Sequence, residues 1–299
     1  MNGYLRTAVL LAGMTAVFLV IGQALGGTQG AIIALLLALA MNAFSYWNSD
    51  KMVLRAYNAQ PIDSGDAQFK ALDEMVTQLA QNAEIPKPKA YIIENPQPNA
   101  FATGRNPENA AVAVTTGLLD GLSMDEVAGV IAHEMAHIKN RDTLIMTITS
   151  TISGALGMLA KMGGLFGRGP QHGNRNSMLS MVAMMLAPMA AMLIQMMISR
   201  AREYEADRIG AEISGKPHDL ADALEKISGI APRVDNYAAE CNPETAHLFI
   251  VSPFIPAGIR KMFSTHPDPS ERIRRLRSMA QPQPQSAADN YSSPQSTAA

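Results

Sequence analysis

Two histidines and a glutamate near the middle of the chain have the spacing of a metal site. They form the run His133-Glu134-Met135-Ala136-His137. Residues four positions apart share one face of a helix, so the two imidazoles can hold one zinc ion. Glu134 lies beside the first histidine, where it can accept a proton from water that the metal activates and return it to a leaving amine. The pattern predicts a hydrolytic metal site, and the alternative is a helix surface that carries two histidines and a solvated glutamate.

A catalytic zinc ion usually has three protein ligands and one open position, so a third ligand must come from another segment. The histidine candidates are His172, His218, His247 and His266. Carboxylates are candidates too, because Glu203 and Asp207 are four positions apart and share one face of a predicted helix. One of them can bind zinc while the other orients a ligating histidine through its free ring nitrogen. Spacing alone leaves open an ordinary charged helix at 202–207.

The elements that must position these residues are predicted from caps and periodicity. Ser123 followed by Glu126 three positions later is a capping box, and it predicts a helix over 124–140 that contains the histidine pair. Further helices are expected at 65–82, at 200–214, at 217–229 and from Asp268 onward. Short strands are expected at 90–93 and 111–115, and residues 99–102 are either a third strand or a loop beside them.

Apolar residues make up 47% of the chain and are grouped in blocks, which indicates a membrane protein with a soluble part. Residues 7–49 contain no charge and fit two helical spans, roughly 5–25 and 30–47, broken near 26–30. A cleaved signal peptide is the alternative for the first block, although it does not explain the second. Two weaker blocks, 143–166 and 176–199, predict spans three and four, with a pair of buried helices as the alternative.

Charge sets the expected orientation and excludes one class of partner. Arg6, Lys51 and Arg55 flank the first pair of spans, and the loop between these spans has no charge, so both ends should lie on the cytoplasmic side. Arg168 and Arg175, between the third and fourth blocks, do not follow this rule. A net charge of −2 gives no sign of nucleic-acid binding, and a single cysteine cannot form a disulfide within the chain.

Several motifs in order resemble the HtpX family, heat-shock-linked bacterial membrane proteases that are similar in their catalytic domain to the CAAX prenyl proteases. The motifs are IAHEMAH at 131–137, SRAREYEAD at 199–207, His266-Pro267 and Glu271-Arg272. The resemblance covers roughly residues 1–280. It implies a fold that is mainly α with a small β-sheet, an α+β zincin-like catalytic domain, plus transmembrane helices.

The apolar blocks, the motifs and the polar composition of the C-terminal residues together predict a division of the chain. The expected parts are a transmembrane hairpin of two spans (1–47), the first part of the catalytic domain (48–142), a second apolar helix pair (143–199), the second part of the catalytic domain (200–280) and a disordered tail (281–299).

The resemblance assigns roles to the residues of the metal site. It implies that His133, His137 and Glu203 bind one zinc ion per chain and that Glu134 is the base. It also implies that Asp207 supports His137 through the ring nitrogen that does not bind metal.

Further residues of the family pattern would meet the substrate. His266 and Arg272 are expected to approach the developing oxyanion, with a proline-rich helix entry and a surface ion pair as the alternative. The edge strand that would pair with an extended substrate corresponds to Asn99, Ala100, Phe101 and Ala102. The alternative for these four residues is a plain sheet edge.

The function that the resemblance implies is endopeptidase cleavage of misfolded or damaged membrane proteins. The expected setting is the bacterial inner membrane, crossed several times, with the site facing the cytoplasm and a role in protein quality control under stress. The partners would be protein substrates and the lipid bilayer, and no nucleic acid. Two alternatives are a processing protease of narrow specificity and a non-catalytic, zinc-stabilised membrane scaffold. A structural zinc site needs four protein ligands and no glutamate beside the first histidine, which argues against the scaffold.

Overall fold

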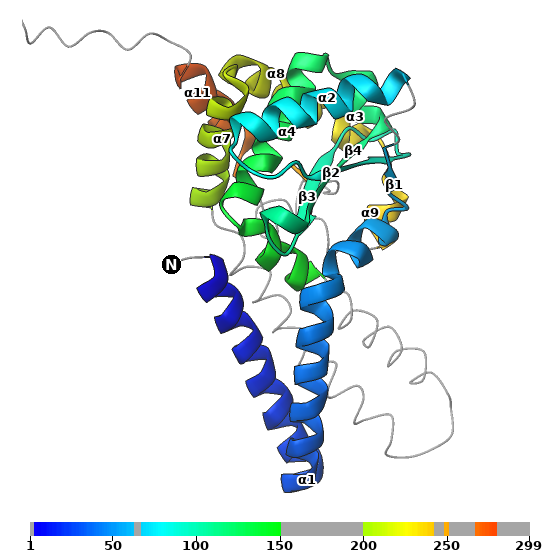
Figure 1. The fold of residues 1–299 in the computed structure, drawn as a ribbon, viewed down its shortest axis with the longest axis vertical. Coiled ribbons are helices and arrows are strands. Elements are labelled where there is room, and N and C mark those ends of the chain that lie inside the picture. The colour runs from blue at the N-terminus through cyan, green and yellow to red at the C-terminus, as the bar shows by residue number, and fades with distance from the viewer. Residues whose placement is uncertain (1–2, 63–66, 151–199, 242–247, 251–266, 280–299) are drawn as a thin grey trace, which may run out of the picture.

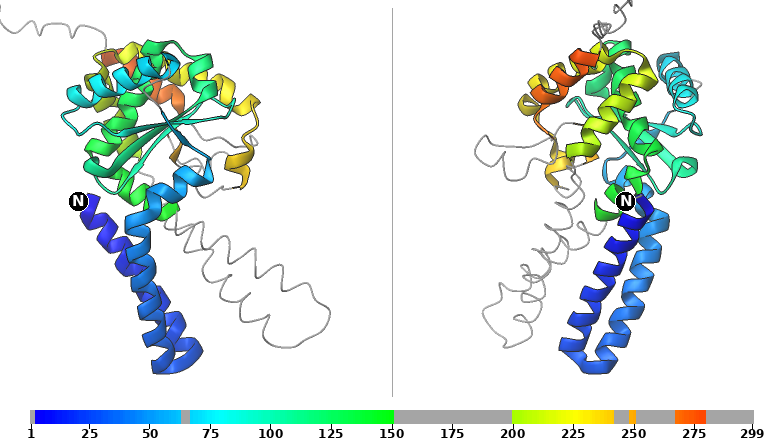
Figure 2. Two further views of the ribbon diagram at one scale, coloured as in Figure 1. Left: turned by 45° about the vertical axis from the view of Figure 1, so that its right-hand side comes forward. Right: turned by 90° about the vertical axis from the view of Figure 1, so that its left-hand side faces the viewer.

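A computed structural model describes residues 3–62, 67–150, 200–241, 248–250 and 267–279 of the chain (Figure 1). A long helical hairpin projects from a region in which helices pack around a small sheet (Figure 2). The helices are α1 (Gly3–Ala56), α2 (Ala67–Asn82), α3 (Thr116–Gly121), α4 (Met124–Lys139), α7 (Arg200–Ser214), α8 (Pro217–Ile230), α9 (Tyr237–Cys241) and α11 (Pro269–Met279). Residues 142–150 are helical as well. The expectation of a mainly α fold with a small sheet is confirmed.

The hairpin is formed by α1, which is broken into two helices by non-helical backbone at Gly26 and Gly27. Gly27 has a φ of 58°, a conformation that glycine adopts without steric cost. The second half continues beyond the predicted end at 47, because its last turns pack on the sheet. Val53 and Leu54 belong to a buried cluster with Phe101 of the sheet, so the hairpin and the globular part share apolar contacts.

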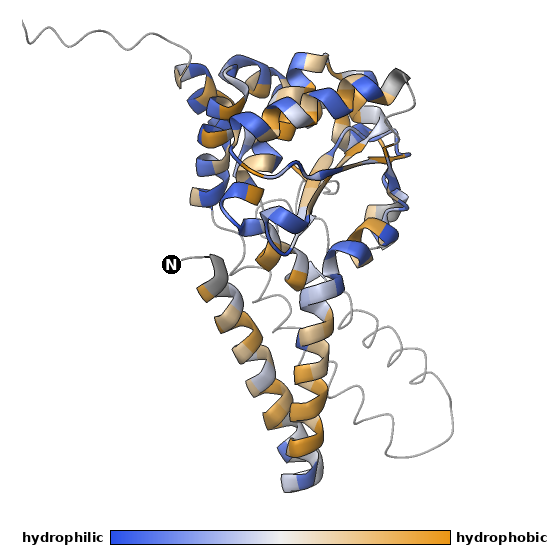
Figure 3. Ribbon diagram, in the orientation of Figure 1, coloured by the Kyte–Doolittle hydropathy of each residue, from blue (hydrophilic) through white to orange (hydrophobic). Residues whose placement is uncertain are grey.

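The surface of α1 is predominantly hydrophobic along the length of the hairpin (Figure 3). Its exposed large apolar side chains are Leu5, Val9, Val20, Ile32, Ile33, Leu36, Leu37, Leu39, Phe44, Trp47 and Met52. Within the described residues, the helix Gly26–Ala56 is long and apolar enough to cross a membrane, and Thr7–Val20 is a shorter apolar helix. The predicted third span begins at residue 143, and its described part, 143–150, is helical and packs on the first half of α1, while its remainder, the predicted fourth span and the predicted tail lie outside the described residues.

The sheet has four strands, and the strand beside the histidine helix lies at one edge. The strands are β1 (Gln60–Pro61), β2 (Lys89–Ile93), β3 (Ala100–Gly104) and β4 (Ala110–Thr115), in the order β1-β2-β4-β3. β2 and β4 are parallel, and β3 is antiparallel to β4. The segment that the sequence left open between strand and loop is therefore an edge strand, which begins one residue after Asn99.

The helix that carries the histidine pair lies at the centre of the globular part, in contact with α2, α7, α8 and β3. Its predicted capping box is present. The Ser123 amide donates to Glu126 Oε2 over 2.8 Å, and the Glu126 amide donates to Ser123 Oγ over 3.3 Å. Both histidines lie among its buried residues. The capping box at Ser123 thus sets where this helix begins, and the burial of its middle turns holds it in the position that places the two histidines.

The helices α7 and α4 come very close together at Gly210. A Cβ atom added to Gly210 would lie 2.8 Å from the Cα atom and 2.9 Å from the backbone nitrogen of His133. These contacts involve backbone, which cannot rotate away as a side chain can. The absence of a side chain at Gly210 therefore lets the two helices approach closely beside the histidine pair.

We expect Gly210→Ala to lower the free energy of unfolding by about 1–3 kcal/mol, because the added methyl forces two packed backbones apart. Thermal unfolding of the full chain in detergent measures the effect. Gly229→Ala is the matched control, since an added Cβ on this exposed glycine of α8 meets no atom within 4 Å. Equal stability of the two variants would contradict the close approach.

Candidate active site

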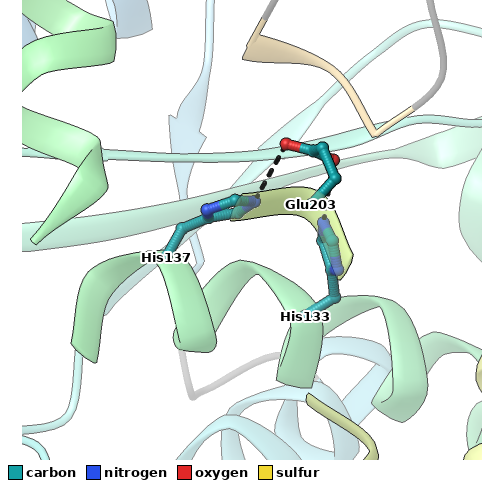
Figure 4. A group of neighbouring side chains, drawn as sticks. All are labelled: His133, His137 and Glu203. Carbon is teal, nitrogen blue, oxygen red and sulfur yellow. Dashed lines mark ion pairs between the residues drawn. The ribbon is translucent and has the colours of Figure 1, made fainter. Parts of the chain in front are cut away.

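Two helices bring together three side chains that can hold a metal ion. His133 and His137 lie one turn apart on α4, with ring centroids 4.8 Å apart. Glu203 on α7 faces both, with its carboxylate oxygens 3.8 Å from His133 Nε2 and 3.6 Å from His137 Nε2 (Figure 4). One ligand atom from each residue lies within 4.8 Å of the others, and all three residues are buried. Two imidazole nitrogens and one carboxylate oxygen form the donor set of a catalytic zinc site, so the residues fit this ion.

Each histidine has a carboxylate beside its other ring nitrogen. Asp207 Oδ1 lies 3.0 Å from His133 Nδ1, and Asp142 Oδ2 lies 3.4 Å from His137 Nδ1. These partners hold the Nε2 atoms toward Glu203, which is the usual arrangement of metal-binding histidines. The carboxylate beside His137 was not singled out by the sequence.

The predicted pairing of Asp207 with His137 needs correction, because Asp207 lies beside His133. The reason is the relative direction of the two helices. Glu203 contacts both histidines, the next turn of α7 carries Asp207 to His133, and Gly210 approaches the backbone of His133 and Ala132. α7 is therefore antiparallel to α4, so moving forward from Glu203 leads to the earlier histidine.

Glu134 joins the site to the edge of the sheet. Its Oε2 accepts a hydrogen bond of 2.8 Å from the backbone amide of Ala102 on β3. Burial of the carboxyl, together with the negative charge of Glu203, raises the pKa of Glu134 to about 8. A buried carboxyl with a pKa near neutrality can both take up and release a proton at physiological pH.

The two histidines differ in their pKa values without metal. Burial, reinforced by the charge of Arg272, lowers the pKa of His133 to about 4. Burial also acts to lower the pKa of His137, but the hydrogen bond to Asp142 and the charges of Glu203 and Glu134 outweigh it and raise this pKa to about 9. A metal ligand must be neutral, so His133 is ready to bind at neutral pH and His137 would release a proton on binding.

Arg272 is drawn fully into this cluster and is not a surface residue. Its Nε and Nη2 atoms donate to the two carboxylate oxygens of Asp207 over 2.8 and 2.7 Å, and Nη1 donates to the Ile250 carbonyl over 3.2 Å. Burial acts to raise the pKa of Asp207, but Arg272 outweighs burial and lowers it to about 2. The alternative of a surface ion pair at Arg272 is wrong, since its side chain is 1% exposed. His266, its predicted companion at the oxyanion, lies outside the described residues.

The four residues predicted to meet the substrate have buried side chains with structural contacts. The Asn99 side chain accepts from the Ala100 amide over 3.1 Å, and Phe101 packs against Tyr57 and Phe249. The Ala100 carbonyl accepts from the Ile250 amide over 3.3 Å. Any contact of this strand with a peptide therefore has to come from its backbone.

A buried histidine–histidine–glutamate set with a second glutamate against the edge of a small sheet defines a site of the metallopeptidase class. The chain belongs to peptidase family M48, since the sequence model of this family matches residues 66–280. This finding confirms the family that the motifs at 131–137 and 199–207 predicted.

The fold is similar to the crystal structure of S. mikatae Ste24p, with 18% sequence identity and a TM-score of 0.51. The match covers 92% of this chain and 64% of that one, so the chain spans less than two thirds of the length of Ste24p. At this identity the likeness establishes the fold.

Proposed function

We propose that the protein is a membrane-anchored zinc endopeptidase in which His133, His137 and Glu203 hold the metal. The observation that carries this proposal is the convergence of their ligand atoms to within 4.8 Å in a buried position. A zinc ion bound there would supply Lewis acidity toward a peptide carbonyl and lower the pKa of water. Membership of family M48 supports the reaction class.

In this proposal Glu134 is the general base. Burial raises its pKa in the metal-free site, and the positive charge of a bound zinc ion would favour the carboxylate that takes a proton from water and gives it to the leaving amine. Its side chain is held by the Ala102 amide, so the carboxylate has a fixed position beside the three ligands. Proton transfer between attacking water and leaving group is thus assigned to one buried residue.

We place the substrate as an extended chain along β3, where edge-strand backbone groups can pair with a peptide. The direct hydrogen bond between Glu134 and Ala102 supports this placement, because it puts the base at the strand that would align the scissile bond. Contact with the developing oxyanion is proposed for Arg272 and His266. Arg272 is supported by its Nη2 atom, which lies 3.4 Å from His133 Nε2, whereas His266 rests on the sequence motif alone.

The apolar hairpin α1 is the proposed anchor, and the ends of both its helices lie on the side of the globular part (Figure 1). Lys51 and Arg55 lie near that end, which by the positive-inside rule favours a cytoplasmic site. Trp47 is exposed and makes an edge-to-face contact with Tyr46, and such an aromatic pair is suited to a membrane interface. Residues 143–199 are proposed as further spans. The bacterial inner membrane, damaged membrane proteins as substrates and a role in quality control follow from the sequence resemblance.

Metal removal tests the reaction class. We expect the full chain, purified in detergent, to contain one zinc ion and to cleave unfolded casein, to lose cleavage when a chelator removes the metal, and to recover it when zinc is added. Zinc content is measured by mass spectrometry and cleavage by gel electrophoresis. Unchanged cleavage by metal-free protein would contradict the proposal. Bound zinc without cleavage of casein, but with cleavage of one membrane protein, would favour a processing protease of narrow specificity.

A further inference from the structure

We propose that Asp142, held by Arg202, is the positioning residue of the ligand His137. This inference rests on the metal site of the proposed function. It concerns the ion pair of Asp142 with Arg202, which the residue spacing in the sequence does not indicate. Neither residue belongs to the run 133–137 or to the pair Glu203 and Asp207.

The carboxylate of Asp142 bridges the buried His137 and the partly buried Arg202. Its Oδ2 atom lies 3.4 Å from His137 Nδ1, and its Oδ1 atom accepts from Arg202 Nη1 over 3.4 Å. The other histidine has a matching arrangement, since Asp207 lies between His133 Nδ1 and Arg272. Each ligating imidazole thus has one carboxylate on Nδ1, and each carboxylate has one guanidinium.

The local backbone explains how Asp142 reaches this position. α4 ends with Asn140 as its C-cap, and Arg141 then has a φ of 60°, a left-handed conformation that costs a non-glycine residue about 1 kcal/mol. The reversal places Asp142 at the start of the helix 142–150, close to the last turn of α4. A strained residue directly before the carboxylate indicates that the turn is held by the contacts that follow it.

Arg202 links this carboxylate to the third ligand. It comes one residue before Glu203 on α7, so the Asp142–Arg202 pair ties the start of the helix 142–150, directly after α4, to the helix of Glu203. The pair also lies at the two ends of the segment 143–199. Its side chains are 8% and 14% exposed. Two roles are therefore possible for the pair, orienting His137 and closing the ends of this segment, and an experiment must separate them.

Orientation follows from the chemistry of imidazole. A carboxylate at Nδ1 favours the tautomer with its proton on that nitrogen and leaves the lone pair of Nε2 for the metal. His137 Nε2 is the atom that faces Glu203, at 3.6 Å. Arg202 fixes the rotation of the Asp142 carboxylate through its hydrogen bond to Oδ1, so loss of either residue should loosen the ring at the position where it would bind metal.

The test measures zinc affinity of the full chain in detergent by competition with a chromophoric chelator. We expect Asp142→Ala to weaken zinc binding by about 10–100-fold, the range found when such carboxylates are removed, and Asp142→Asn to weaken it less because the amide oxygen still accepts from Nδ1. The visible spectrum of the cobalt-substituted Asp142→Ala protein should also change. Asp125→Ala is the control, since Asp125 lies at the exposed start of α4, the helix of His137, and pairs with Lys216, and it should leave the affinity unchanged.

A charge swap separates the two roles. The double variant Asp142→Arg with Arg202→Asp restores an ion pair across the segment 143–199 but puts no carboxylate on His137. We expect zinc affinity to stay low in the swap. Recovery of wild-type affinity in the swap, or unchanged affinity in Asp142→Ala, would overturn the positioning role. His133→Ala tests the metal site itself. If wild type and His133→Ala bind zinc equally, the proposed metal centre is refuted. If His133→Ala loses zinc while the Asp142 variants keep wild-type affinity, only the role of Asp142 is refuted.

Discussion

Glu134→Gln is expected to abolish peptide cleavage while zinc stays bound. The substitution keeps the size of the side chain and an oxygen that can accept from the Ala102 amide, which Glu134 Oε2 does now over 2.8 Å. It removes the ability to take a proton, and general acid–base catalysis contributes about 10²–10⁴-fold to a rate. The rate of casein cleavage should fall by this factor, and the zinc content should remain that of the wild type.

Glu134→Ala serves as the companion variant. It removes the base and also the hydrogen bond to the edge strand, so its cleavage should be lost as well, again with zinc retained. A difference in KM between the Gln and Ala variants would report on the contact with Ala102. Cleavage by Glu134→Gln at the wild-type rate would rule out Glu134 as the base, whatever the metal content.

Elements with local signals could be predicted from the sequence. The capping box at Ser123 placed the histidine helix at 124–140, and the structure has it at Met124–Lys139. Asp268 was expected to begin a helix, and its side chain accepts from the Ser270 amide over 2.9 Å at the start of α11. Such signals act over three or four residues, so no tertiary contact is needed to read them.

The family motifs predicted the approach of Glu203 to the two histidines, but three other contacts of the site could not be predicted. The partner of Asp207 depends on the antiparallel crossing of α4 and α7, and the intervening residues 143–199 carry no sign of that direction. Asp142 gave no signal, because a carboxylate after a helix end is common and only the left-handed Arg141 turns it toward His137. The hydrogen bonds that the Arg272 guanidinium donates to Asp207 gave no signal in the sequence either, because they depend on the packing of α11 against α7.

Glu203→Ala is expected to lose both zinc and cleavage. Two imidazoles would remain, and the carboxylate whose two oxygens lie 3.8 Å from His133 Nε2 and 3.6 Å from His137 Nε2 would be gone. The loss of affinity should exceed the about 100-fold upper range for residues that only orient a ligand, because a direct ligand is removed. Glu203→Asp shortens the side chain by one methylene, so its oxygen falls about 1.5 Å short and should restore binding only in part. Zinc content and chelator competition measure both variants.

The matched control is Glu205→Ala on the same helix. Glu205 is exposed and pairs with Arg208, and in a helix it points about 200° away from Glu203, so its removal should change neither zinc nor cleavage. Each variant removes one negative charge from α7, so a difference between them shows that the orientation of Glu203 toward the histidines matters, and not only the charge of the helix. Retention of zinc by Glu203→Ala with cleavage intact would leave a metallopeptidase whose third ligand comes from another segment. Loss of zinc in both variants would instead mean that the charge of the whole helix, and not a single ligand, holds the ion.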